Sequence, residues 1–119
     1  RLGLPYRVVE LCAGDLTFAS MHTFDLEVYA PGLDKWLEVS SVSAIGDFQA
    51  RRGRIRFRRE GTGQIDFVHS LNGSGLATPR VWAALIEHGY QADGTIRVPE
   101  VLEDYVGRSV LRRSAALGS

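Results

Sequence analysis

Apolar and polar residues alternate with a period of two along several short stretches, the pattern of half-buried β-strands. The clearest stretch is residues 23–30, where Phe24, Leu26 and Val28 share one side and acidic residues lie between them. Residues 31–34, Pro-Gly-Leu-Asp, predict a turn, and residues 35–43 return as the antiparallel partner strand. An apolar run over residues 6–11 predicts a further strand before this hairpin.

The second half of the chain shows the same period. Residues 65–72 carry one alternating set on each side and predict a single continuous strand, while residues 95–98 predict a short one. Ile55 and Phe57 alternate with arginines and predict a strand that reaches residue 65 through a hairpin turn at residues 60–63. This second hairpin adds to the antiparallel strands of the first half.

Helical signals follow the strands. Thr78 predicts an N-cap, Pro79 suits the first helical position, and the helix extends to His88 with Gly89 as its C-terminal cap. Short helices are expected over residues 47–52 and 99–105. The pattern predicts an α+β fold in which an antiparallel sheet of about six strands is flanked by helices. Residues 1–107 are expected to form one unit, and residues 108–119, where the pattern is weak, a mobile tail.

Composition and charge narrow the class of protein. Fourteen basic and fourteen acidic residues cancel, so the net charge by itself predicts neither nucleic-acid nor membrane binding. No apolar run is long enough to span a bilayer, and there is no signal-peptide pattern. The single cysteine, Cys12, excludes an internal disulfide and a multi-cysteine zinc site, and we expect it to be buried. These features suit a reducing cytoplasm.

A candidate anion site lies where the strand over residues 65–72 leads into the helix. Gly73 and Gly75 flank Ser74, which allows a ligand to approach the backbone closely. Arg80 follows directly in the first turn of the helix, where the helix dipole and the guanidinium both favour a phosphate. An ordinary strand, turn and helix is the alternative that these residues leave open.

Glu38 and Ser41 are a second candidate pair. Three positions apart, they fall on opposite faces of a regular strand. Both can meet one magnesium-bound phosphate only if a β-bulge lies between them.

Six arginines are concentrated within residues 51–59. They suggest RNA, but the neutral chain and the lack of an interleaved aromatic platform favour a solvated strand face that carries ion pairs. One or two of these arginines are expected to reach a nucleotide.

Several segments taken together resemble a known family. They are L-G-L-P-Y-R-V-V-E-L-C-A-G-D-L, T-F-D-L-E-V-Y-A-P-G, E-V-S-S-V-S, D-F-Q-A-R-R, V-H-S-L-N-G-S-G-L-A-T-P-R and V-P-E-V-L. In this collinear order, from Leu2 to about Gly107, they resemble the C-terminal part of the catalytic domain of bacterial seryl-tRNA synthetases. The resemblance implies part of a class II aminoacyl-tRNA synthetase fold.

The resemblance also implies roles for particular residues. Arg80 matches the arginine of the third class II signature motif, which holds the terminal phosphate of ATP. The segment Glu38, Val39, Ser40 and Ser41 matches the family's ATP site, with Glu38 and Ser41 expected to hold Mg²⁺. Asn72 and Ser74 match the serine pocket, and the strand alternation places both on one face.

The implied activity is that of a serine–tRNA ligase, which activates serine with ATP and transfers it to the 3′ end of serine tRNA. The expected partners are serine, ATP, Mg²⁺ and serine tRNA, in a cytoplasmic homodimer that does not bind a membrane. A site made of Arg, Glu, Mg²⁺ and hydroxyls suits catalysis by positioning and charge neutralisation.

Two departures from the family pattern qualify this expectation. Met21-His22 stands where an alanine-lysine pair is usual, so the role of that lysine is unfilled or passed to His22. The first two signature motifs and the tRNA-binding helical arm are absent from the 119 residues, so we expect the chain by itself to have at most feeble activity.

Two other functions stay open at this point. One is an amino acid ligase for a carrier protein, against which the single cysteine argues because no zinc-ligand set accompanies it. The other is a non-catalytic interaction module derived from a synthetase. Retention of Glu38, Ser41, Asn72, Ser74 and Arg80 together is not expected of a decayed site.

Overall fold

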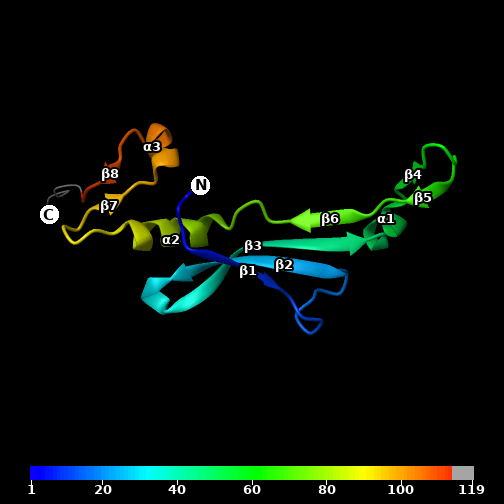
Figure 1. Cartoon of the computed structure of the whole chain (residues 1–119), viewed down its shortest axis with the longest axis horizontal. Helices are drawn as coiled ribbons and strands as arrows, with labels where there is room; N and C mark the ends of the chain where they lie inside the picture. The colour runs from blue at the N-terminus through cyan, green and yellow to red at the C-terminus, as the bar shows by residue number, and fades with distance from the viewer. Residues whose placement is uncertain (114–119) are drawn as a thin grey trace, which may run out of the picture.

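Four antiparallel strands form the central sheet of the computed structural model, which describes residues 1–113 (Figure 1). In spatial order they are β1 (Tyr6–Glu10), β2 (His22–Ala30), β3 (Lys35–Gly46) and β6 (Ser70–Gly73). The expected strands and the hairpin between residues 23 and 43 are confirmed. The turn at its end is a short 3-10 helix, Pro31–Leu33, closed by Asp34 in the left-handed conformation (φ 51°).

A β-bulge, which Glu38 and Ser41 would need in order to share a ligand, lies at Val39. Leu26 of β2 is paired with Ser40 of β3, and its neighbour Glu27 is paired with Glu38, so Val39 is the extra residue of β3. One extra residue shifts the alternation by one position. Glu38 and Ser41 therefore lie on the same face of the sheet although they are three residues apart.

This shared face carries many polar side chains, and strand β1 adds Arg7, paired with Glu27, and the apolar Val9, paired with Asp25. Directly paired residues in an antiparallel sheet put their side chains on one side, and the register pairs Glu27 with Glu38, Asp25 with Ser41, and Ser43 with Asn72. We call these six residues, together with Thr23, the polar face. A 2.7 Å hydrogen bond between the hydroxyls of Thr23 and Ser43 agrees with this assignment.

The opposite face of the sheet packs against helix α2 (Thr78–Gly89). Val28 and Val39 of the sheet and Val81 and Ala84 of the helix form the buried core, with Leu85 packed at its edge. Burying these apolar side chains stabilises the fold. The helix therefore covers one end of the sheet on the face opposite the polar face.

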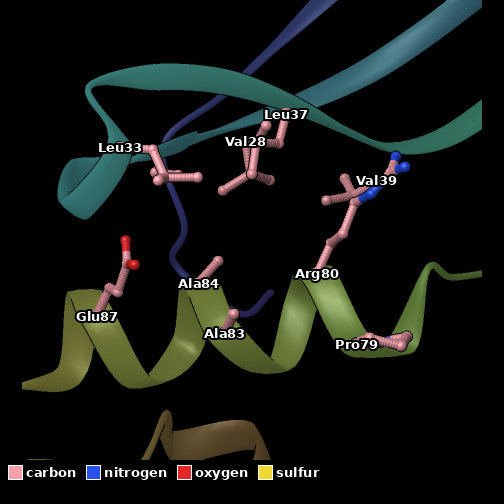
Figure 2. Close-up of a pocket in the computed structure, with 10 residues that line it drawn as sticks. Val28, Leu33, Leu37, Val39, Pro79, Arg80, Ala83, Ala84 and Glu87 are labelled. Carbon is pink, nitrogen blue, oxygen red and sulfur yellow. The ribbon is translucent and has the colours of Figure 1, made fainter.

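A cavity of about 230 Å³ separates α2 from the end of the β2–β3 hairpin. Figure 2 shows Glu87 near one end of it and Arg80 near the other, with apolar side chains such as Val28 between them. The main-chain N–H of Gly32 donates to the Glu87 carboxylate at 3.2 Å, and the ring of His88 bonds the carbonyl of Tyr29 at 2.8 Å. These two contacts hold the hairpin against the helix.

Both predicted caps of α2 are wrong. The cap position at its start is occupied by Ala77, with no side-chain cap bond, because the N–H of Ala77 is tied to the carbonyl of Val39 at 2.9 Å and sets where the helix begins. Pro79 lies in the first turn, as expected. Gly89 is the last helical residue rather than the cap, and it lies against Arg97.

Gly89 is expected to be intolerant of any side chain. A Cβ at this position would lie 2.6 Å from the main-chain oxygen of Arg97, which cannot swing aside. Gly89→Ala should destabilise the fold by about 2 to 3 kcal/mol, the usual cost of overpacking. Urea unfolding measures this loss. Gly14→Ala is the control, because a Cβ there meets no atom within 4 Å, and equal stabilities of the two variants would contradict the prediction.

The continuous strand predicted over residues 65–72 is wrong. It is divided into β5 (Ile65–Phe67), which pairs with β4 (Arg56–Arg58), and β6, which pairs with β3 in the central sheet. The helix α1 (Phe48–Gly53) precedes β4. Alternation predicts strands but not their neighbours, and here the chain changes partner between Phe67 and Ser70.

The C-terminal part forms a third small sheet. Strand β7 (Ile96–Arg97) pairs with β8 (Val110–Leu111), and helix α3 (Glu100–Val106) lies between them in the chain. Strand β8 falls within residues 108–119, the segment predicted as a mobile tail, and residues 114–119 lie outside the described residues. The α+β class is confirmed, but among residues 1–113 the strands form three sheets and not one of about six.

The molecule is elongated, measuring 69 × 33 × 29 Å (Figure 1). The β4–β5 hairpin with α1 stands at one end, and α3 with β7 and β8 at the other. Cys12 is exposed, contrary to expectation, and its thiol lies 3.2 Å from the Asp15 carboxylate in the loop after β1. Among residues 1–113, no helix has the length and apolar character needed to cross a membrane.

Candidate active site

Arg80 and Glu38 meet across the boundary between helix and sheet. The guanidinium donates from Nη1 to the main-chain carbonyl of Glu38 at 2.5 Å and lies 3.9 Å from its carboxylate. Figure 2 shows Arg80 rising from the first turns of α2 toward β3 beside Val39. Both side chains are about half exposed, 53% for Arg80 and 45% for Glu38, so both can reach a ligand. The structure thus brings together the two charged residues that the sequence predicted for one site.

The loop between β6 and α2 lies along the bulge. The hydroxyl of Ser40 donates to the carbonyl of Ser74 at 2.6 Å, and the N–H of Ser74 donates to the carbonyl of Ser41 at 3.0 Å. With the bond from Ala77 to Val39, these contacts fasten residues 74–77 to β3. Two segments more than 30 residues apart in the sequence become one site.

The four residues of the Glu38 to Ser41 segment differ in what they offer to a ligand. Val39 is buried in the core at 8% exposure, so only its main chain is available. The hydroxyl of Ser40 is already used to hold the loop. Glu38 and Ser41 lie on the polar face. Of the four residues, Glu38 and Ser41 are therefore the two whose side chains a ligand could contact.

The two residues predicted for the serine pocket lie near this segment in different ways. Asn72 is exposed on β6 and shares the polar face with Ser43. Strand β6 ends at Gly73, so the alternation that placed Ser74 on the same face does not extend to it. Its exposed side chain is positioned instead by the main-chain bonds to Ser40 and Ser41.

Asp25 is a residue that the sequence reasoning missed. It is paired with Ser41, and its Oδ1 is the one buried side-chain oxygen or nitrogen among the described residues without a hydrogen-bond partner. A buried carboxylate oxygen without a donor is costly, and a hydrated cation would satisfy it. No local signal reveals this, because the pairing of Asp25 with Ser41 depends on the register around the bulge.

The donor set suits magnesium. Mg²⁺ prefers oxygen ligands and is commonly bound by one or two carboxylates together with substrate phosphates. Glu38, Ser41 and the unpartnered Asp25 oxygen supply such groups on one face. Within residues 1–113 no cluster of three or more His, Cys, Asp or Glu side chains is placed to hold a metal by itself.

His22 does not join the polar face. It is paired with Ala44, two positions from Phe24 along β2, and therefore points to the other side of the sheet. Its ring lies 4.5 Å from that of Phe24, and Nε2 lies 2.8 Å from the Glu10 carboxylate. A role for His22 in place of the family's lysine at this site is not supported by this position.

Comparison with known proteins agrees with the fold. The family model described as the tRNA synthetase class II core domain (G, H, P, S and T) matches residues 1–89. The chain belongs to this class II tRNA synthetase core domain family.

Within the family, the similar proteins are serine–tRNA ligases. That of Gemmatimonas aurantiaca is 58% identical over 111 residues, which is 93% of this chain and 26% of that protein. That of Nitratidesulfovibrio vulgaris is 58% identical over 106 residues, 89% of this chain and 25% of that protein. The chain thus spans about a quarter of the length of the relatives it matches.

Solved structures give the same result. Seryl-tRNA synthetase from Pyrococcus horikoshii, complexed with ATP, superposes with a TM-score of 0.88 at 40% identity, covering 96% of this chain and 26% of that one. Cytoplasmic serine-tRNA ligase from Naegleria fowleri, in complex with AMP, superposes with a TM-score of 0.84 at 34% identity, covering 96% and 27%. The resemblance to seryl-tRNA synthetases drawn from the sequence is confirmed.

Proposed function

We propose that these residues form part of the active site of a serine–tRNA ligase, which activates serine with ATP and transfers it to serine tRNA. The single observation that carries the proposal is the meeting of Arg80 with Glu38 at the bulge, beside Ser41 and the Ser74 loop. The identity of the similar proteins supports serine as the amino acid.

In the first reaction, a carboxylate oxygen of serine attacks the α-phosphorus of ATP. The bond from that phosphorus to the oxygen bridging it to the β-phosphate breaks, pyrophosphate leaves, and seryl-adenylate forms. In the second, a hydroxyl of the 3′-terminal adenosine attacks the seryl carbonyl carbon and AMP leaves. Neither step needs a protein nucleophile, so positioning and electrostatic stabilisation suffice.

Each residue has a defined task in this scheme. Arg80 turns its guanidinium from Glu38 to the terminal phosphate of ATP, where two N–H donors match two phosphate oxygens. Glu38 and Ser41 would hold Mg²⁺, which would neutralise phosphate charge. Asn72 and the hydroxyl of Ser74 contact serine, and hydrogen bonds to its hydroxyl penalise alanine, which would leave them unpaired.

The proposal includes Mg²⁺, a homodimer and a cytoplasmic location, each carried over from the family resemblance. Light scattering of the natural-length protein tests the dimer. The carrier-protein ligase and the interaction module receive no support from a particular contact in this structure.

Serine-dependent ATP–pyrophosphate exchange by the natural-length protein tests the proposed activity. We expect exchange with serine, strong discrimination against alanine, and transfer to tRNA but not to a carrier protein. Exchange without serine dependence, or transfer to a carrier protein, would overturn the assignment. We expect the 119-residue chain assayed alone to show at most feeble pyrophosphate exchange, and robust exchange would contradict that expectation.

A further inference from the structure

A basic projection stands apart from the proposed ATP site. It comprises residues 47–67, which contain α1, β4, β5 and the loop between the two strands. Figure 1 shows it at the end of the molecule opposite α3, β7 and β8. Its six arginines are all exposed: Arg51, Arg52, Arg54, Arg56, Arg58 and Arg59.

The projection is locally cationic although the chain is neutral. Six arginines against three carboxylates, Asp47, Glu60 and Asp66, leave a net charge of +3 in residues 47–67. The rest of the chain therefore carries the compensating negative charge. An asymmetry of this kind attracts an anionic partner to one end of the molecule.

The carboxylates of the projection form ion pairs with only some of its six arginines. Arg51 lies 2.7 Å from Asp47 and Arg59 lies 2.5 Å from Asp66, which confirms the expected ion pairs. The hydrogen bond from Arg51 lowers the pKa of Asp47 from its ordinary value, so this carboxylate stays charged. Arg58 donates to the main-chain carbonyl of Gly63 at 2.9 Å.

The three remaining guanidiniums, of Arg52, Arg54 and Arg56, lie within 4 Å of no carboxylate among the described residues. Two of the three, Arg52 and Arg56, lie over aromatic rings. Arg56 lies 4.9 Å from the ring centroid of Phe67, which Arg51 also approaches at 4.7 Å. Arg54 follows directly after α1 and takes its left-handed cap conformation (φ 54°).

Aromatic rings support other arginines of the projection in the same way. Arg52 lies over Phe48 at 4.7 Å and Arg59 over Phe57 at 5.3 Å. Phenylalanine rings are therefore interleaved with this charge, and guanidiniums lie over them. A guanidinium held over a ring keeps its N–H donors for an acceptor and loses less entropy when it binds one. The arrangement brings several positive charges close together, and a bound oxyanion would reduce the repulsion between them.

The position of the projection indicates which kind of oxyanion it binds. Strand β3 passes from Glu38 through Ser41 and Ser43 directly into α1. A hydrogen bond from the Ser70 hydroxyl to the Gln49 side chain, 2.9 Å long, anchors α1 to β6. Along the sheet the proposed ATP residues come first, then Ser43 with Asn72, and then the arginines. The projection thus lies beyond the proposed serine pocket, on the side away from Arg80.

We infer that the basic projection, through Arg52, Arg54 and Arg56, binds backbone phosphates of the serine tRNA whose 3′ end enters the pocket at Asn72. The inference rests on the proposed function, because it takes the RNA from that reaction. Arginine is well suited to this contact because its planar fork matches phosphate oxygens. Contacts of this kind confer affinity and orientation rather than sequence specificity.

The test measures binding of serine tRNA to the natural-length protein at several salt concentrations. The variant is Arg52→Gln/Arg54→Gln/Arg56→Gln, which leaves both ion pairs and the Arg58 contact intact. The matched control is Arg108→Gln/Arg112→Gln/Arg113→Gln, which removes three exposed arginines from the opposite end of the molecule. We expect the first variant to weaken binding on the order of tenfold or more at low salt and to reduce the salt slope by about 2 to 3.

Each outcome decides the question. A smaller effect in the control than in the variant supports the inference, and equal effects overturn it, because they would show attraction by net charge alone. Unchanged tRNA binding in the variant also overturns it. Serine-dependent pyrophosphate exchange needs no tRNA, so it should stay at the wild-type rate, and a large loss there would place these arginines at ATP instead. A wild-type protein without such exchange would reject the proposed function separately.

Discussion

Replacing Arg80 with glutamine is expected to lower kcat/KM for serine-dependent ATP–pyrophosphate exchange by about 10²- to 10³-fold, the usual loss for one donor to transition-state charge. Glutamine keeps a hydrogen-bond donor but removes both the charge and the bidentate fork. Folding should be affected less than the reaction, because the contact with the half-exposed Glu38 carboxylate contributes no more than about 1 kcal/mol. The hydrogen bond to the Glu38 carbonyl contributes about 1 to 3 kcal/mol.

Two further variants sharpen this experiment. Arg80→Lys retains the charge and should recover only part of the activity, since an ammonium group cannot reproduce the fork. Arg108→Gln, at an exposed arginine between α3 and β8, should behave as wild type. If Arg80→Gln lost less than about tenfold, the terminal phosphate would have to be held elsewhere.

Glu38→Gln is expected to raise the Mg²⁺ concentration needed for ATP binding by at least about tenfold, the low end of the loss seen even for outer-shell partners of a metal. The amide is nearly isosteric with the carboxylate but lacks its charge. The hydrogen bond from Arg80 goes to the main-chain carbonyl of Glu38, so it survives the substitution. The change therefore isolates the carboxylate.

The measurement is a Mg²⁺ titration of ATP binding, which does not depend on turnover. Glu10→Gln is the control, because Glu10 is paired with Phe24 and therefore lies on the other face of the same sheet. An unchanged Mg²⁺ requirement in Glu38→Gln would remove Glu38 from the metal site. Ser41 and the unpartnered oxygen of Asp25 would then be the remaining candidates on the polar face.

The bulge explains why residues that look unsuited in the sequence can share a ligand. Without the extra residue at Val39, Glu38 and Ser41 would point to opposite sides, and one of them would face α2. The bulge residue itself points into the core with Val28 and Val81. One extra residue thus packs in the core and also turns its neighbours toward the polar face. Bulges are often found beside active sites because they redirect side chains in this way.

Local sequence determined much of the scaffold. Side-chain period and turn chemistry act over a few residues, so each local pattern predicts one element. Alternation over residues 23–30 predicts a strand, the Pro-Gly pair predicts a turn, and the apolar stripe after Pro79 predicts a helix. The motif residues Glu38 and Arg80 could also be singled out. Strand geometry also indicated that Glu38 and Ser41 could share a ligand only if a bulge lay between them.

Only the tertiary structure decided which strands pair with one another and which side chains come into contact. Strand register determined three features of the site and its surroundings. These are the division of residues 65–72 between two sheets, the pairing of Asp25 with Ser41, and the position of His22 away from the polar face. The guanidiniums over Phe48, Phe57 and Phe67 depend likewise on how α1 packs beside the β4–β5 hairpin. Register and packing are set by hydrogen bonds and contacts between residues distant in the chain, which no local pattern of residues encodes.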